Sequence, residues 1–206
     1  MDNFTILLND NLDILKEIGS IGMGHASTSL AQMLNMKVIM SIPTVYIMTP
    51  TEASDYLQKR SEVSWAVRLG LQGDAKGNIL QLLSKQFAVK IINYFFQNNL
   101  EDLGDLDDMS LSVIQEIGNI TSGAYCNSLA SMTGLFIDIS TPTHSKNIDA
   151  DIGLDERKKS NQPMIIINNS FFIGEEEINS DFLFIPDDET IEKVLRKLKE
   201  YYGLTG

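Results

Sequence analysis

The chain has few of the residues that cross-link a protein or bind transition metals. It contains one cysteine, Cys126, so no disulfide can form within the chain. It has only two histidines, His25 and His144, and together with one cysteine they are too few for a Cys/His zinc site. We expect His25 to make a local hydrogen bond and His144 to lie in a loop.

Positive charge is also scarce. Lys and Arg number 16 against 28 Asp and Glu, and the formal net charge is −12. This balance argues against binding to nucleic acid or to an anionic membrane surface, because both need clustered cations. No run of 18 apolar residues could span a bilayer, and the start, Met1-Asp2-Asn3, lacks the basic segment of a secretory signal. We therefore expect a cytoplasmic protein.

An internal repeat is the strongest pattern in the sequence. With a shift of 99 residues, Glu17-Ile18-Gly19 aligns with Glu116-Ile117-Gly118, and Ser29-Leu30-Ala31 aligns with Ser128-Leu129-Ala130. The register continues without a gap to Pro43 and Pro142. The repeat predicts two duplicated halves, about 1–100 and 101–206.

Each half shows the same order of expected elements. A long helix comes first, then an extended segment around a proline, a polar irregular stretch, two strands and a closing helix. Such halves usually share one core, so we expect a single α/β (α+β) domain over 1–206 with pseudo-two-fold symmetry. Two long central helices and two closing helices should pack on a shared sheet of about six strands. The expected long helices are 12–34 and 111–132, the extended segments 37–48 and 135–143, the irregular stretches 51–61 and 146–162, the strands 65–72, 78–83, 164–173 and 181–185 with a polar turn at 174–180, and the closing helices 85–96 and 190–202.

Both long helices carry polar residues at i, i+4 and i+7, a spacing that places them on one face. A proline follows 23 residues after the last member of each set. An exposed acid on a single helix usually indicates only a solvated surface, but here the pattern occurs twice at matched offsets. The two sets are Asp13, Glu17, Ser20 and Pro43 in the first half, and Ser112, Glu116, Asn119 and Pro142 in the second.

This pattern, Asp/Ser-x3-Glu-x2-Asn followed by Pro, resembles the signature of the CheC-type phosphatases of bacterial chemotaxis, a family that includes CheX and the phosphatase domain of FliY. The second set matches fully, whereas Ser20 replaces the family's Asn in the first. The resemblance implies a phosphatase that removes the phosphoryl group from the aspartyl phosphate of the response regulator CheY. It also implies that the regulator supplies Mg²⁺ and a lysine, so this chain should bind no metal or cofactor itself.

The resemblance assigns Glu116 and Asn119 as the catalytic residues. A carboxamide offers both a donor and an acceptor, so Asn119 can orient a water toward the phosphoryl group. Glu116 suits an ion pair with the regulator's lysine, and Ser112 and Asp13 should support docking. Because a serine hydroxyl reaches less far than an amide, we expect the first site, with Glu17 and Ser20, to be weak or inactive.

A non-catalytic reading stays open. A protein of this family could instead be a regulatory binding module for CheY or for the receptor deamidase CheD. The intact Asn119 favours the enzyme, because a pure adaptor would not need that amide.

Overall fold

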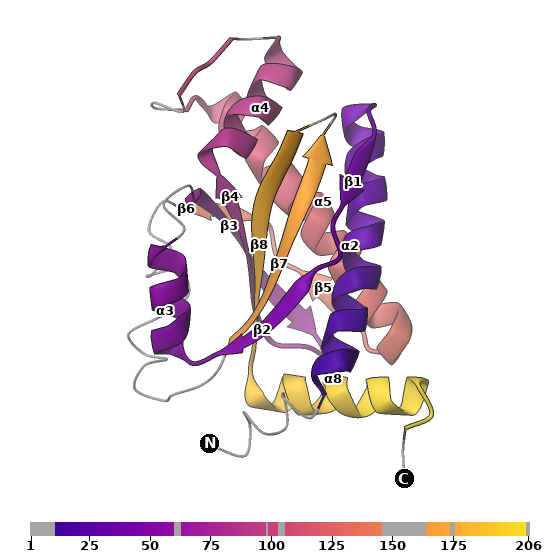
Figure 1. Ribbon diagram of the computed structural model, residues 1–206. Helices are drawn as coiled ribbons and strands as arrows, with labels where there is room; N and C mark the ends of the chain where they lie inside the picture. Colours follow the sequence, from indigo (N-terminus) through magenta and orange to yellow (C-terminus); the bar gives the residue numbers. More distant parts are fainter. Residues whose placement is uncertain are drawn as a thin grey trace.

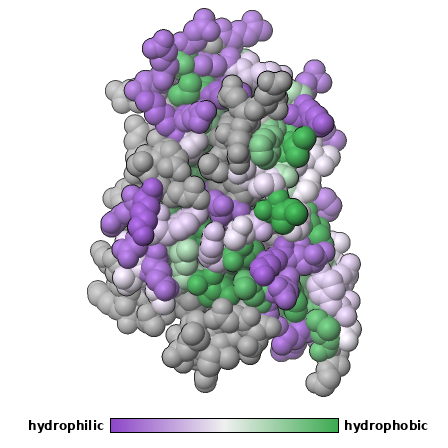
Figure 2. Space-filling view, viewed as in Figure 1, coloured by the Kyte–Doolittle hydropathy of each residue, from purple (hydrophilic) through white to green (hydrophobic). Residues whose placement is uncertain are grey.

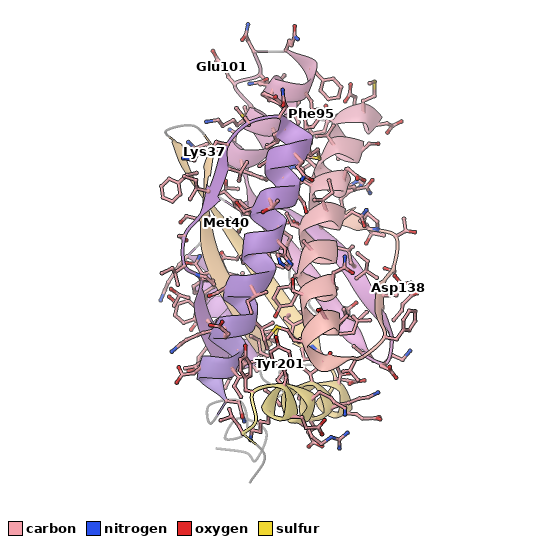
Figure 3. All side chains as sticks on the ribbon, turned by 90° about the vertical axis from the view of Figure 1, so that its right-hand side faces the viewer. Lys37, Met40, Phe95, Glu101, Asp138 and Tyr201 are labelled. Atoms are coloured by element: carbon pink, nitrogen blue, oxygen red, sulfur yellow. The ribbon has the colours of Figure 1, made fainter. Side chains whose placement is uncertain are left out.

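Two long helices lie side by side and carry the motif residues (Figures 1 and 3). The computed structural model describes residues 11–59, 63–97, 99–102, 106–145, 164–173 and 176–204. Helix α2 spans Leu12–Leu34, and α5 spans Asp108–Thr133. The Asp107 carboxylate accepts a hydrogen bond from the Ser110 backbone N–H (2.9 Å), which starts α5 three residues before the predicted boundary. Each helix ends at a left-handed residue, Asn35 or Gly134.

Strands from both halves form one antiparallel sheet in the order β1-β7-β8-β4-β3-β5. Strand β2 also pairs with β7, and β6 also pairs with β3, so the eight strands of the described residues occupy six positions across the sheet. This mixed helix–strand architecture confirms the predicted fold class. The strands are β1 Val38–Met40, β2 Thr44–Met48, β3 Val63–Gly73, β4 Gly77–Ser84, β5 Ile137–Ile139, β6 Thr143–Ser145, β7 Met164–Ile173 and β8 Glu176–Pro186.

The two halves exchange their edge strands. In the first half, β2 pairs with β7 of the second half, with Val45 opposite Ile167. In the second half, β6 pairs with β3 of the first half, with His144 opposite Val67. The central pair, β4 and β8, also joins the halves. Each half therefore supplies the edge strand that pairs with the other half. The pairing of β6 with β3 places His144 beside β3 of the first half.

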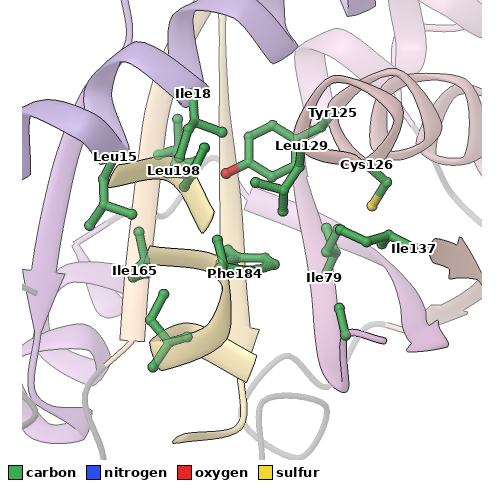
Figure 4. Packing of buried hydrophobic residues seen from close by; sticks show 14 of the residues in the cluster. Leu15, Ile18, Ile79, Tyr125, Cys126, Leu129, Ile137, Ile165, Phe184 and Leu198 are labelled. Carbon is green, nitrogen blue, oxygen red and sulfur yellow. The ribbon is translucent and has the colours of Figure 1, made fainter. Parts of the chain in front are cut away.

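The main core lies between the sheet and the layer formed by α2 and α5. These two helices run in opposite directions, because the start of each packs in the same cluster as the end of the other. Helix α8 (Asp188–Tyr201) packs at the start of α2 and the end of α5 (Figure 4). Helix α4 (Lys85–Phe96) packs at the end of α2 and the start of α5. Ser84 and Asp187 cap the two closing helices, because their side chains accept hydrogen bonds from the Phe87 and Thr190 backbone N–H groups.

The opposite face of the sheet carries a helix that the sequence analysis missed. Residues 51–61 were expected to be irregular, but α3 spans Pro50–Gln58. Thr49 and Glu52 form a capping box, and Pro50 occupies the first turn, where its missing N–H costs nothing. Ala53 of this helix is buried against the sheet.

Two further boundaries differ from the prediction. The polar turn expected at 174–180 is wrong, because β8 begins at Glu176, which pairs with Ile173 of β7. Each extended segment predicted around a proline is split into two short strands on either side of that proline, which cannot donate a ladder hydrogen bond. The stretch 146–162 lies outside the described residues. In the described part of the chain, no helix has the length and apolar character of a membrane span.

Candidate functional site

The motif residues of α5 lie on one face of the helix, and none of them is buried. At 3.6 residues per turn, Ser112, Glu116 and Asn119 fall within about 60° of the helix circumference. Glu116 and Ser112 are exposed, and Asn119 is half-buried. Within the described ranges, neither the Glu116 carboxylate nor the Asn119 amide has a hydrogen bond or ion-pair partner. The structure thus brings the predicted second site together and leaves its two key groups available.

Close packing beneath this face fixes the height of α5 above the sheet. A Cβ added at Gly118 would lie 2.4 Å from Cγ1 of Val67 on β3, so no other residue fits there without a shift. Pro142 lies beside the same stretch of helix, and its carbonyl oxygen is 3.5 Å from the Gln115 side-chain nitrogen. In the first half, a Cβ at Gly19 would lie 3.4 Å from Cγ of Pro43. In both halves the motif proline therefore lies beside the motif helix.

The first motif set occupies the matching positions on α2, but its side chains make hydrogen bonds and an ion pair that Glu116 and Asn119 do not make in the described chain. Glu17 is exposed, as Glu116 is. The Ser20 hydroxyl donates to the Lys16 backbone carbonyl (3.0 Å), and the Lys16 ammonium pairs with Asp13 (3.1 Å). The only proton of the serine hydroxyl is therefore used within the helix.

The surroundings of the first set are also more apolar. A groove of about 330 Å³ lies beside Ser20, and none of the described residues that line it is charged. Ile39 and Ile42 at this groove are 47% and 88% exposed. Figure 2 shows apolar side chains on the surface over β1 and the turn into β2. The corresponding residues of the second half are Asp138 and Thr141, so the two sites present different surfaces.

Sequence reasoning missed one cluster beside the second site. The Gln115 side-chain nitrogen is 2.9 Å from Nδ1 of His144, and the His144 ring lies 5.6 Å from the Trp65 ring. His144 was expected in a loop, but it belongs to β6 and faces α5. His25 makes a hydrogen bond as predicted, but its partner is not local: Nδ1 lies 2.8 Å from the hydroxyl oxygen of Ser128 on α5, 103 residues along the chain.

The buried titratable groups behind the site are not poised for chemistry. Burial raises the pKa of the Cys126 thiol to about 12, with a smaller contribution from Asp138. Burial also raises the pKa of the neighbouring Tyr125 hydroxyl. Among the residues with described positions, no three His, Cys, Asp or Glu side chains cluster in a way that could hold a metal ion.

Known proteins share both the sequence pattern and the fold. The model of the CheC-like family matches twice, at residues 11–47 and 109–145, and each match contains one motif helix and its proline. A curated relative from Bacillus subtilis, "CheY-P phosphatase CheC", is 29% identical over 202 residues, which cover 94% of this chain and 96% of the relative.

Solved structures agree on the architecture. FliY from Thermotoga maritima superposes with a TM-score of 0.76 at 20% identity, over 92% of this chain and 96% of that one. A chain of the CheX–CheY–BeF3–Mg²⁺ complex from Borrelia burgdorferi superposes with a TM-score of 0.53 at 19% identity, over 81% of this chain and 96% of that one. The family match falls on both motif helices, so the chain is similar in sequence to the CheC-like family over these two segments, and the solved structures share its fold.

Proposed function

We propose that this protein is a phosphatase that acts on the aspartyl phosphate of a CheY-type response regulator, in the cytoplasm and in chemotaxis. The observation that carries the proposal is the pair Glu116 and Asn119, both without a partner in the described chain, on an exposed helix face. The B. subtilis relative is named a CheY-P phosphatase, and the B. burgdorferi relative was solved in complex with CheY.

Such a site suits the chemistry of phosphoryl transfer. The reaction needs little covalent work from the protein, and its rate depends mostly on positioning and charge stabilisation. The Asn119 amide has two donors and an acceptor, so it can hold a water in line with the bond that breaks. The exposed Glu116 carboxylate can pair with a lysine of the docked regulator, and Ser112 adds a polar contact one turn away. The regulator would bring its own Mg²⁺, and this chain would bind no cofactor.

The first site differs from the second in the group that would orient the water. Ser20 has a shorter side chain than asparagine, and its hydroxyl proton already bonds to the Lys16 carbonyl. The Asp13 carboxylate is likewise paired with Lys16. We infer that this site contributes little or no turnover, although Glu17 remains exposed for docking.

The direct test mixes the protein with a phosphorylated CheY-type regulator and Mg²⁺ and follows the loss of phosphoryl groups. Phosphate release faster than the regulator's own rate is expected. Binding without any acceleration would contradict the enzymatic proposal and favour the binding module for CheY or CheD.

A further inference from the structure

Gln115 lies next to the proposed catalytic amide on α5. It is about 40° around the helix from Asn119, on the side toward β3 and β6. Its side-chain nitrogen is 2.9 Å from Nδ1 of His144 and 3.5 Å from the carbonyl oxygen of Pro142. His144 is held in turn by strand pairing with Val67 and by contact with the Trp65 ring.

These contacts determine which end of the Gln115 amide is free. An amide nitrogen only donates, so His144 accepts at Nδ1 and carries its proton on Nε2. Both amide hydrogens of Gln115 then have acceptors, His144 and the Pro142 carbonyl. The carbonyl oxygen Oε1 has no donor in the described part of the chain. A fixed acceptor is therefore left free at the border of the Glu116–Asn119 face.

The first half serves as an internal comparison, because it lacks this arrangement. Lys16 occupies the position of Gln115, and Val45 occupies the position of His144. The Lys16 ammonium pairs with Asp13 one turn away. A cation at this position would repel a cation of a docked protein, whereas the neutral acceptor of Gln115 can bind an N–H donor.

We propose that Gln115 is a docking residue of the second site and that His144 is the positioning residue that holds it. Gln115 Oε1 accepts a hydrogen bond from a donor of the docked regulator, a lysine, an arginine or a backbone N–H. This inference rests on the proposed phosphatase function and adds to it the residues that set affinity for the regulator. Because neither residue orients the attacking water, the pair acts on binding and not on the chemical step.

The test measures steady-state phosphate release and, separately, affinity for the regulator loaded with beryllofluoride and Mg²⁺. Gln115→Met keeps the length of the side chain but removes its acceptor, and His144→Val installs the first half's residue. Each should raise KM and Kd about three- to tenfold, the value of one hydrogen bond, and leave kcat close to that of the wild type. The double variant should be no weaker than either single variant, because both remove the same interaction.

Two controls separate docking from general loss of structure. His144→Asn retains an acceptor atom at the δ position and should restore affinity to near the wild-type value. Lys16→Met, the matched change in the first half, should leave kcat unchanged, because the first site contributes little or no turnover. Wild-type KM and Kd in Gln115→Met would overturn the inference, as would a fall in kcat with KM unchanged. If the wild-type protein itself neither bound the regulator nor accelerated phosphate release, the proposed function would fail and the inference with it.

Discussion

Gly22 of α2 lies directly against Tyr125 of α5. A Cβ added at Gly22 would lie 2.5 Å from Cδ2 of Tyr125 and 3.2 Å from its Cα. The absence of a side chain at Gly22 therefore sets the separation of the two helices that carry both motif sets.

Gly22→Ala should destabilise the protein. Overpacking of this contact costs about 1–3 kcal/mol, which exceeds the gain in helix propensity of up to about 1 kcal/mol. Gly24→Ala is the matched control, because a Cβ at Gly24 meets no atom of the described residues within 4 Å. It should raise the free energy of unfolding by up to about 1 kcal/mol. Chemical denaturation measures both, and equal effects of the two variants would show that the helices do not meet as described.

Asp74 should link stability to pH. Its carboxylate accepts a hydrogen bond from the Phe136 backbone N–H (3.0 Å) and pairs with Lys193 (3.1 Å). The Phe136 hydrogen bond, followed by the Lys193 contacts, lowers the pKa of Asp74. Because the pKa is lower in the folded chain, the ionised carboxylate stabilises the fold at every pH above the pKa of Asp74 in the unfolded chain, which is about 4. This stabilisation is lost as the pH falls through the pKa of Asp74 in the folded chain.

Asp74→Asn should therefore lower the unfolding temperature at neutral pH, and the difference from the wild type should shrink on acidification below about pH 4. Thermal melts at several pH values check this. A difference that grows toward acid pH would have the wrong sign for a carboxylate held in its ionised form.

Cys126 should be inert in the folded protein. The thiolate is the reactive form, and burial raises the pKa of this thiol to about 12. At mildly alkaline pH, a thiol reagent should modify Cys126 only when the chain unfolds, so the rate of modification should rise with denaturant. Rapid and complete modification without denaturant would contradict the burial of Cys126 on the inner face of α5.

Ser20→Asn should restore activity to the first site. In a background of Asn119→Ala, the added amide at position 20 should raise phosphate release, because it supplies the donor and acceptor that the serine hydroxyl lacks. Ser20→Ala in the wild-type background is the control and should leave turnover unchanged. A large loss of activity in Ser20→Ala would show that the first site already works through its hydroxyl.

Much of the fold could be predicted from the sequence, because the repeat fixes the order of elements twice. The boundaries of α2 and α4 match the prediction. Helix α3 was missed because its residues are mostly polar, although Thr49 and Glu52 hold the spacing of a capping box. The exchange of edge strands could not be predicted, because strand pairing between halves leaves no local pattern.

The candidate site also has one part that could be predicted from the sequence and one part that could not. Glu116 and Asn119 share a helix face, so their spacing alone placed them together. Gln115 and His144 are 29 residues apart in the chain, and they meet only because β6 pairs with β3 of the other half. Helical periodicity cannot indicate such a contact, and no motif in the sequence marked it.

Asn119→Ala is the most direct test of the proposed mechanism. The measurement is phosphate release from the phosphorylated regulator, together with affinity for its beryllofluoride-loaded form. Loss of one well-placed orienting group should slow turnover by roughly two to three decades, while affinity falls much less. Unchanged turnover in the Asn119→Ala variant would contradict the assignment of Asn119 as the residue that orients the water.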